Sequence, residues 1–515
     1  MDGWQRARLI PTSGMSGQDE QEARATSSLL AVLTAVKEFG NGLVRELGGV
    51  TGTIETFIEI PFVLADGRSV RPDGLIRVTR GAKTWVCLVE VKTGNSPLGR
   101  EQVESYLDLA REQKFDALVT ISNDLAPAPG VHPVEFDRRK AKSVELHHRS
   151  WAELLSLAVM HRVHTGVSDP DQAWILGELI RYLEHPKSGA LDFQDMGSSW
   201  VPVREAIAAG TLRPIDKGIA EVALRWEQLV RFSALRLERE LGSGVQVVLS
   251  RKEQSDPQLR QQTIRAGLAQ SGSMSGTIRI PGTVGDIEIE ADLRTGRVTV
   301  SVDVSAPLEG RPVTRVNWIV RQLQEAPESA RIDSFAHMAR TSMSELLKTV
   351  RLDPNVLVAD PKADIRRFRV SATSQLGTKR GVGRGSFIDS ILSAVDGLYG
   401  SVLQSIRPWT AKPPQLPKPG SAVDTAVVEL RLSPTEVDEM QAEGFAPPSQ
   451  TSPLAVPIDW ASLPVPSADH RVEMDPPMVS WDDQLDDLAE ERQLTPLTSE
   501  EESGALGFEA ISGRD

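Results

Sequence analysis

The sequence is poor in the residues that would place it outside the cell or in a membrane. Its 515 residues include a single cysteine, Cys87, so no intramolecular disulfide can form. It contains no run of about eighteen apolar residues, the length a membrane-spanning helix needs. The N-terminal residues lack the apolar core of a secretory signal. These absences predict a cytoplasmic protein without a membrane partner.

Several common catalytic and metal-binding patterns are missing as well. His147 and His148 have no Cys or His partner at zinc spacing, so we interpret them as structural histidines. The sequence holds no Ser-His-Asp constellation with a nucleophile elbow. Its glycine-rich segment, 377–385, lacks the Gly-Lys-Ser/Thr ending of a P-loop. A structural zinc site, a serine hydrolase and a P-loop NTPase are therefore not indicated.

Negative charge and proline are concentrated at the C-terminal end. Residues 411–515 hold 14 of the 33 prolines and carry 21 Asp+Glu against 6 Lys+Arg, a net charge of −15. This composition predicts a mostly disordered acidic tail, in which Trp460 and Trp481 are candidate docking points for a protein partner. The alternative is an unstructured, solvated tail. The first 410 residues carry a net charge of +1, which permits a local basic groove for nucleic-acid phosphates.

The rest of the chain divides into three regions by its pattern. We expect an α/β domain over 1–170, a helical connector over 171–242 and an α+β domain without an assigned role over 243–410. In the first domain the periodicity predicts the order α-β-β-β-α-β, then a strand and a helix. These elements are expected at 19–47, 54–60, 75–78, 84–92, 98–113, 117–122, 143–148 and from 150 onward. In the α+β domain we expect strands at 245–250, 276–280, 286–293, 298–304 and 366–371, and helices at 314–325, 334–349 and 385–405.

Two of the expected strands carry acidic residues at adjoining ends. Asp73 stands at the start of one strand, and Glu90 and Lys92 end the next, with a turn at 80–82 joining the two into a hairpin. Because side chains alternate along a strand, Glu90 and Lys92 lie on one face. Mg²⁺ prefers oxygen ligands, and Asp73, Glu90 and the backbone carbonyl of Val91 can supply them. Lys92 could then orient a metal-activated water or stabilise the attacked phosphate. The alternative is an ordinary hairpin whose glutamate and lysine form a solvated pair.

These residues resemble the motifs of the PD-(D/E)XK nuclease superfamily. Pro72-Asp73 is similar to its PD, Glu90-Val91-Lys92 to its (D/E)xK, and Gln102 followed by Tyr106 to the Q-x-x-x-Y helix motif of the RecB-like branch. The resemblance covers roughly residues 15–165.

The resemblance implies a restriction-endonuclease-like domain, with a mixed central sheet flanked by helices. It also implies Mg²⁺ or Mn²⁺ as the metal and DNA as the substrate. An acid on the first helix often completes such a site, and Glu22 is the first candidate here, with Glu20 second. Gln102 and Tyr106 would steady the lysine or a flanking phosphate.

Together these features predict a metal-dependent nuclease that hydrolyses DNA phosphodiester bonds, such as an endonuclease in DNA repair or in defence against foreign DNA. One alternative is a non-catalytic nucleic-acid-binding module on the same fold. Another is an interaction protein that works through its acidic tail. The sequence does not distinguish single-stranded from double-stranded substrates.

The glycine-rich segment of the second domain is also basic. Lys379, Arg380 and Arg384 lie among its glycines, just before an expected helix. Glycines let backbone N–H groups approach a phosphate, and a helix N-terminus favours anions. These residues are therefore candidate contacts to the DNA backbone. The alternative is a flexible, solvated surface loop.

Overall fold

The computed structural model describes residues 5–6, 18–94, 96–126, 131–337, 339 and 341–411. These residues fall within one compact unit that spans 1–415. The predicted acidic tail, with Trp460 and Trp481, lies outside them apart from its first residue. In the described part of the chain, no helix is long and apolar enough to cross a membrane.

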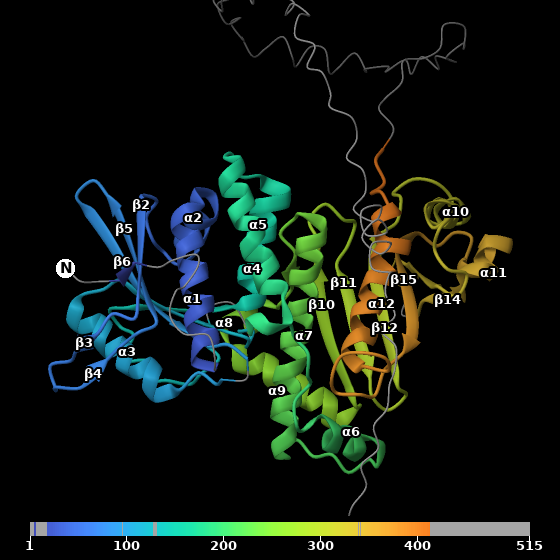
Figure 1. Cartoon of the computed structure of the whole chain (residues 1–515). Helices are drawn as coiled ribbons and strands as arrows, with labels where there is room; N and C mark the ends of the chain where they lie inside the picture. The colour runs from blue at the N-terminus through green and yellow to red at the C-terminus, as the bar shows by residue number, and fades with distance from the viewer. Residues whose placement is uncertain are drawn as a thin grey trace, which may run out of the picture. The chain divides into compact units, whose positions relative to one another are not determined.

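The first part of the chain builds a mixed six-stranded sheet with the order β1-β2-β5-β6-β7-β8 (Figure 1). β2, β5 and β6 are antiparallel neighbours, whereas β6, β7 and β8 run parallel. The strands are β1 Gln5–Arg6, β2 Thr53–Ile58, β5 Gly74–Arg80, β6 Lys83–Val91, β7 Ala117–Ser122 and β8 Glu145–Ser150. A small hairpin, β3 Phe62–Val63 with β4 Ser69–Val70, is inserted between β2 and β5.

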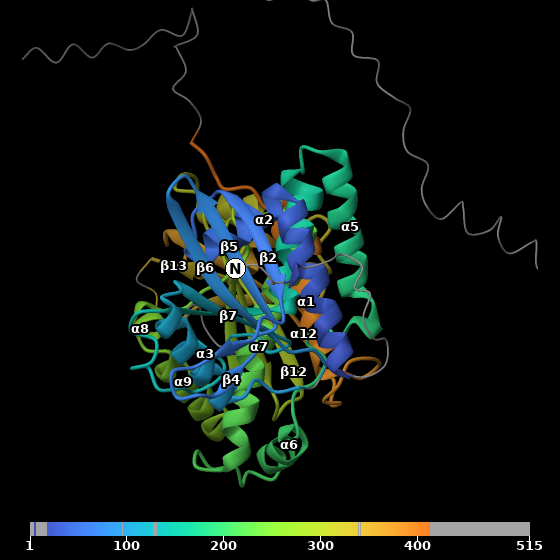
Figure 2. The same cartoon turned by 60° about the vertical axis from the view of Figure 1, so that its left-hand side comes forward.

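Helices cover both faces of this sheet (Figures 1 and 2). On one face, side chains such as Ile76, Val89 and Val91 share an apolar core with α1, α4 and α5. On the other face, Leu75 and Leu88 pack with α3, the crossover between the parallel strands β6 and β7. The helices are α1 Gln18–Ala35, α2 Lys37–Glu46, α3 Arg100–Gln113, α4 Trp151–Val159 and α5 Pro170–Glu184. The chain is therefore mixed α/β here; β2, β5, β6, α3 and β7 follow the predicted order, with a second helix before them and the small β3–β4 hairpin added.

The single helix predicted over 19–47 is wrong, because the chain breaks it at Val36. Val36 is extended (φ −106°, ψ 101°), and α2 begins directly after it. Gly40 in α2 makes the break possible, because a Cβ there would lie 2.2 Å from the carbonyl oxygen of Leu33. Only glycine allows the second helix to approach the first this closely.

The second sheet is antiparallel throughout and has seven strands, in the order β14-β13-β15-β12-β11-β10-β9. α7 contacts β10, and α12 contacts β12 and β15. The strands are β9 Gln246–Val247, β10 Ser273–Arg279, β11 Ile287–Asp292, β12 Arg297–Ser305, β13 Arg331–Ala336, β14 Met343–Leu346 and β15 Ile365–Gln375. The helices of this part are α6 Trp200–Ala208, α7 Lys217–Leu241, α8 Arg251–Ser255, α9 Pro257–Gln270, α10 Pro312–Gln322, α11 Leu347–Leu352 and α12 Phe387–Ser401.

The helix predicted over 334–349 is also wrong. The chain instead forms β13, β14 and the short helix α11 in and around this range. Ile332 and Ser334 alternate into the buried face of the sheet, and the Ser334 hydroxyl donates to the Leu357 carbonyl at 2.6 Å. Alternation with a period of two is typical of a strand. The antiparallel pairing of Arg331 with Leu346 then holds this segment as a hairpin.

The helical region between the sheets contributes to both cores. Leu176, Leu179 and Leu183 of α5 are buried in the core of the first sheet. Trp226 of α7 is fully buried in the core of the second sheet. Leu125, just after β7 in the first domain, belongs to the same cluster as Trp226. The two sheets are thus joined through packed side chains as well as through the chain.

Candidate functional site

Two carboxyl groups meet where β5 begins and β6 ends. Gly74 pairs with Val89, so the antiparallel register places Asp73 opposite Glu90. The Val91 N–H donates to Asp73 Oδ2 at 2.8 Å and fixes that carboxyl against β6. Alternation along the strands puts both side chains on the face that α3 covers. The structure therefore brings Asp73, Glu90 and the backbone of Val91 together.

Lys92 joins this pair to the first helix. Its Nζ lies 2.8 Å from Glu90 Oε1 and 3.3 Å from Glu22 Oε2. Its side chain is only 14% exposed, and that of Glu90 is fully buried. The lysine carbonyl accepts a hydrogen bond from Trp151 Nε1 at 2.9 Å. Of the two candidate acids on α1, it is Glu22 that pairs with Lys92 in the described structure.

Burial shifts the ionisation of these groups. It raises the pKa of Glu90 to about 8, and the neighbouring Asp73 carboxylate adds to this rise. Burial likewise raises the pKa of Asp73. Burial works against the charge on Lys92, yet Glu90 above all, with Asp73 and Glu22, raises the pKa of the lysine. Lys92 is therefore a cation at neutral pH.

The buried carboxyl group of Glu90 is suited to bind a divalent cation. Both of its carboxyl oxygens are buried; Oε1 faces the Lys92 amine at 2.8 Å, whereas Oε2 accepts no hydrogen bond and has no ion-pair partner among the described residues. Buried oxygens of this kind are costly unless they are paired. A hard cation held by Asp73 and Glu90 would pair them. Within the described ranges no three His, Cys, Asp or Glu side chains are assembled as ligands. The rest of a Mg²⁺ shell would therefore come from water, substrate phosphate or a backbone carbonyl such as that of Val91.

Gln102 and Tyr106 stand on α3 above the carboxyl pair. The Gln102 amide lies 3.4 Å from the Tyr106 hydroxyl, which donates to the Arg71 carbonyl at 3.1 Å. Burial, and then the charge of Glu90, raises the pKa of Tyr106. We expected this pair to steady the lysine or a phosphate. In the described structure Tyr106 holds the carbonyl of Arg71, two residues before Asp73, and the role of the pair toward the lysine or a phosphate stays a prediction.

A polar row that the sequence analysis missed continues from Glu90 across the sheet. Glu90 pairs with Thr120 and Thr120 with His148 along β6, β7 and β8. The Thr120 hydroxyl lies 2.9 Å from His148 Nδ1 and 2.9 Å from His132 Nε2. His148 Nε2 lies 2.7 Å from the Asp124 carbonyl, which can only accept, so Nε2 carries the proton.

Burial keeps both of these histidines neutral. It lowers the pKa of His132 to about 4 and also lowers that of His148. These contacts agree with the interpretation of His148 as structural, and they support the β7 side of the carboxyl pair. Thr120 and His148 each stand two residues after a leucine in their strands, Leu118 and Leu146. Because side chains alternate along a strand, this spacing was the sequence signal that the polar residues share a face with those leucines.

The segment 186–196, here called the bridging segment, closes the site beyond Lys92. The Gly94 N–H donates to the Gly189 carbonyl at 2.9 Å, and the Asn123 side-chain amide donates to the carbonyls of Gly94 and Gly189. Gly189 has φ +80°, and a Cβ on it would lie 2.7 Å from Thr93 and within 2.7 Å of Gln21. Glycine is required for this close approach. The sequence analysis did not identify this segment.

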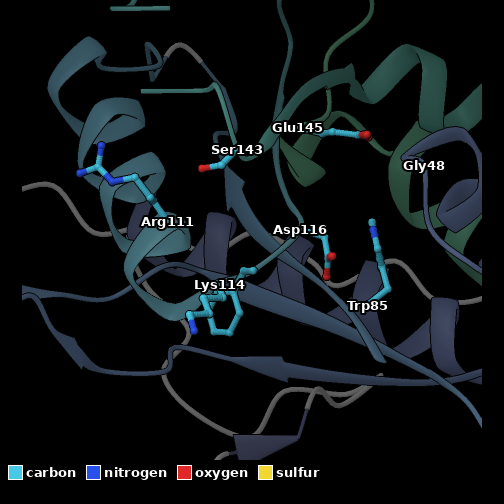
Figure 3. A pocket seen from close by; sticks show the side chains of 8 residues that line it. Gly48, Trp85, Arg111, Lys114, Asp116, Ser143 and Glu145 are labelled. Carbon is cyan, nitrogen blue, oxygen red and sulfur yellow. The ribbon is translucent and has the colours of Figure 1, made fainter. Parts of the chain in front are cut away.

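Lys379, Arg380 and Arg384 lie on another part of the molecule, in the loop between β15 and α12, and are exposed. A separate pocket of about 450 Å³ lies at the other end of the first sheet (Figure 3). Its walls include Trp85, Asp116 and Glu145, which stand near the starts of β6, β7 and β8, away from the carboxyl pair. Comparison of the chain with known family models, with curated proteins and with solved structures gives no match.

Proposed function

We propose that the protein is a metal-dependent nuclease that hydrolyses DNA phosphodiester bonds through a site built on Asp73, Glu90 and Lys92. The observation that carries the proposal is the buried carboxyl pair. Glu90 lies fully buried beside Asp73; the Lys92 amine pairs with its Oε1 at 2.8 Å, and its Oε2 has no donor among the described residues. A purely structural ion pair would satisfy such oxygens with donors.

The arrangement of the first sheet supports a restriction-endonuclease-like domain. A helix precedes three antiparallel strands, and α3 then crosses to a parallel strand. The three motifs stand on the second and third of these strands and on the crossover helix, at one end of the sheet. This is the arrangement that the resemblance to PD-(D/E)XK nucleases implies.

Each residue has a distinct role in the proposed chemistry. Asp73 and Glu90 would hold Mg²⁺ or Mn²⁺, which lowers the pKa of bound water and offsets charge on the phosphate. Lys92 remains protonated, because Glu90, Asp73 and Glu22 raise its pKa. It therefore acts as a fixed positive charge that orients the water or stabilises the transition state, and it does not accept a proton. Glu22 holds the lysine amine at 3.3 Å. Tyr106 holds the backbone that leads into Asp73.

The test is cleavage of linear duplex, circular duplex and single-stranded DNA with Mn²⁺ or with EDTA. Wild type should cut at least one of these substrates with Mn²⁺ and none with EDTA. Asp73→Asn and Glu90→Gln should abolish cutting while the proteins stay folded. Glu101→Gln is the matched control, because Glu101 is an exposed acid on α3. Wild-type cutting by either site variant would refute the assignment.

Metal binding separates the enzyme from a non-catalytic module. A site that holds Mn²⁺ raises the melting temperature with metal concentration, and Asp73→Asn should remove the rise. A metal-stabilised wild type that cuts none of the three DNA forms would favour a binding module on the same fold.

A further inference from the structure

The glycine-rich loop 377–385, here called the basic loop, has a defined shape. The Thr378 and Lys379 N–H groups both lie 3.0 Å from the Gly385 carbonyl, and the Lys379 carbonyl accepts from the Phe387 N–H at 3.0 Å. The Gly383 N–H donates to Asp389 at 2.6 Å. Gly383 and Gly385 have φ of 101° and 81°, which glycine adopts without strain. The loop is therefore a folded turn held by hydrogen bonds.

The basic loop is fastened to the bridging segment. The Val382 N–H donates to the Gln194 carbonyl at 3.1 Å, and the Met196 N–H donates to the Arg380 carbonyl at 2.9 Å. Arg380 also pairs with Asp195, at 3.2 Å. Two backbone hydrogen bonds and an ion pair thus fix the loop to residues 194–196.

The other end of the bridging segment stands at the carboxyl site. Gly189 contacts Gly94 and Asn123, and the Gln21 amide donates to the Lys187 carbonyl at 2.8 Å, beside Glu22. Gly189 and Gln194 are five residues apart. A fully extended chain of that length spans at most about 17 Å. Gly189 and Gln194 therefore lie no farther apart than about five nucleotide steps at 3.4 Å per step along one strand.

The charges on the basic loop are directed to solvent. Lys379 and Arg384 are exposed, and in the described structure neither has a carboxylate within ion-pairing distance. The carboxylate of Asp389, the nearest acid of α12 in sequence, is engaged by the Gly383 N–H. Two exposed cations are thus presented by a rigid turn, without a partner from the described chain. Exposed cations without a carboxylate partner suit the phosphates of a nucleic-acid backbone.

We propose that the basic loop binds the backbone of the DNA that is cut at the carboxyl site, with Lys379 and Arg384 as the phosphate contacts. The bridging segment sets the spacing between cleavage and contact. The inference rests on the proposed nuclease function, because the substrate that reaches both places is DNA. It assigns a role to part of the second sheet domain, as the element that positions substrate.

The experiment measures binding of the full chain to a long fluorescent DNA duplex in EDTA, so that cleavage does not interfere. The variant is Lys379→Ala/Arg384→Ala. The matched control is Lys348→Ala/Lys362→Ala, which removes two exposed lysines elsewhere on the second domain. A charge-preserving variant, Lys379→Arg/Arg384→Lys, completes the set. Thermal melting checks that all four proteins are folded.

The salt dependence of binding gives the expected size of the effect. Each phosphate contact contributes about 0.9 to the slope of log affinity against log salt. Loss of two contacts should lower the slope by about 1.8. When salt rises fourfold, wild type should then lose about twelvefold more affinity than Lys379→Ala/Arg384→Ala. The control and the charge-preserving variant should keep the wild-type slope.

The outcomes separate this inference from the nuclease proposal. An unchanged slope in Lys379→Ala/Arg384→Ala, or an equal fall in the control, would overturn the role of the basic loop even if cleavage by the carboxyl site is confirmed. A specific fall in slope supports the loop even if Asp73→Asn and wild type prove equally unable to cut DNA. Failure of wild type to bind DNA at all would overturn the inference.

Discussion

Lowering the pH should weaken metal binding at the carboxyl site, because a proton on Glu90 competes with the ion. Burial, assisted by Asp73, raises the pKa of Glu90 to about 8. Below that pH the metal-free site holds a proton that a divalent cation must displace. The apparent affinity should therefore fall about tenfold for each pH unit below 8. Between pH 8 and pH 6 the loss is about 100-fold, or about 2.7 kcal/mol at 1.36 kcal/mol per unit.

The same ionisation should destabilise the metal-free protein as pH rises. The folded state keeps its proton up to about pH 8, whereas an unfolded glutamate releases it near its ordinary value. Between these values the folded state binds more protons, so the free energy of unfolding falls as pH increases. Glu90→Gln should remove this fall. In Asp73→Asn the fall in stability should end below pH 8, because loss of the neighbouring negative charge lowers the pKa of Glu90.

Calorimetric titration with Mn²⁺ from pH 6 to pH 8, and chemical unfolding in EDTA over the same range, measure the two effects. Glu101→Gln serves as the control that keeps the wild-type pH dependence. Metal affinity that stays constant across this range would refute the reasoning, because it would mean that Glu90 is already ionised or does not bind the ion.

Three further predictions concern other parts of the molecule. Lys92→Ala should bind DNA nearly as wild type does yet cut at least ~100-fold more slowly in single-turnover assays, because a preorganised charge is lost. A wild-type cutting rate with weaker DNA binding would instead make the lysine a phosphate anchor. Gly189→Ala should lower stability by about 1–3 kcal/mol and impair cutting, because strain and a clash with Thr93 combine; Gly210→Ala, with φ +65° and open space, isolates the strain alone. Removing 411–515, with its net charge of −15, should leave DNA binding equal or tighter, and weaker binding at fixed salt would assign the tail to the DNA site.

Local patterns were sufficient to predict the part of the fold that builds the site. β6 is a long apolar strand that ends in alternating charged residues, and Gly81 takes φ +59° in the turn that pairs it with β5. That register alone sets Asp73 opposite Glu90. The motif spacing and the period of two therefore predicted their convergence, and Lys92 followed from the same alternation.

Features that depend on distant contacts could not be read from the sequence. The break at Val36 follows from the packing of α2 against α1 around Gly40, which no local signal encodes. The sequence did not predict the hairpin of β13 and β14, because its alternation of buried residues is short and one of the buried positions is the polar Ser334. Thr120, His132 and His148 meet only after β7 and β8 have paired. The contact of the bridging segment with the basic loop joins residues nearly two hundred positions apart.

The packing of α4 against α7 has a consequence for how the molecule unfolds. Arg231 pairs with Glu153, the Ser156 hydroxyl donates to Glu238 at 3.0 Å, and the Gln228 amide donates to the Leu125 carbonyl at 2.9 Å. Separating the two sheets would expose apolar side chains such as Leu125 to water and break these polar contacts. The two sheets should therefore melt in a single cooperative transition. A substitution in the core of the second sheet then lowers the free energy of unfolding of the sheet that carries the carboxyl site by the same amount, although it touches none of the site's residues.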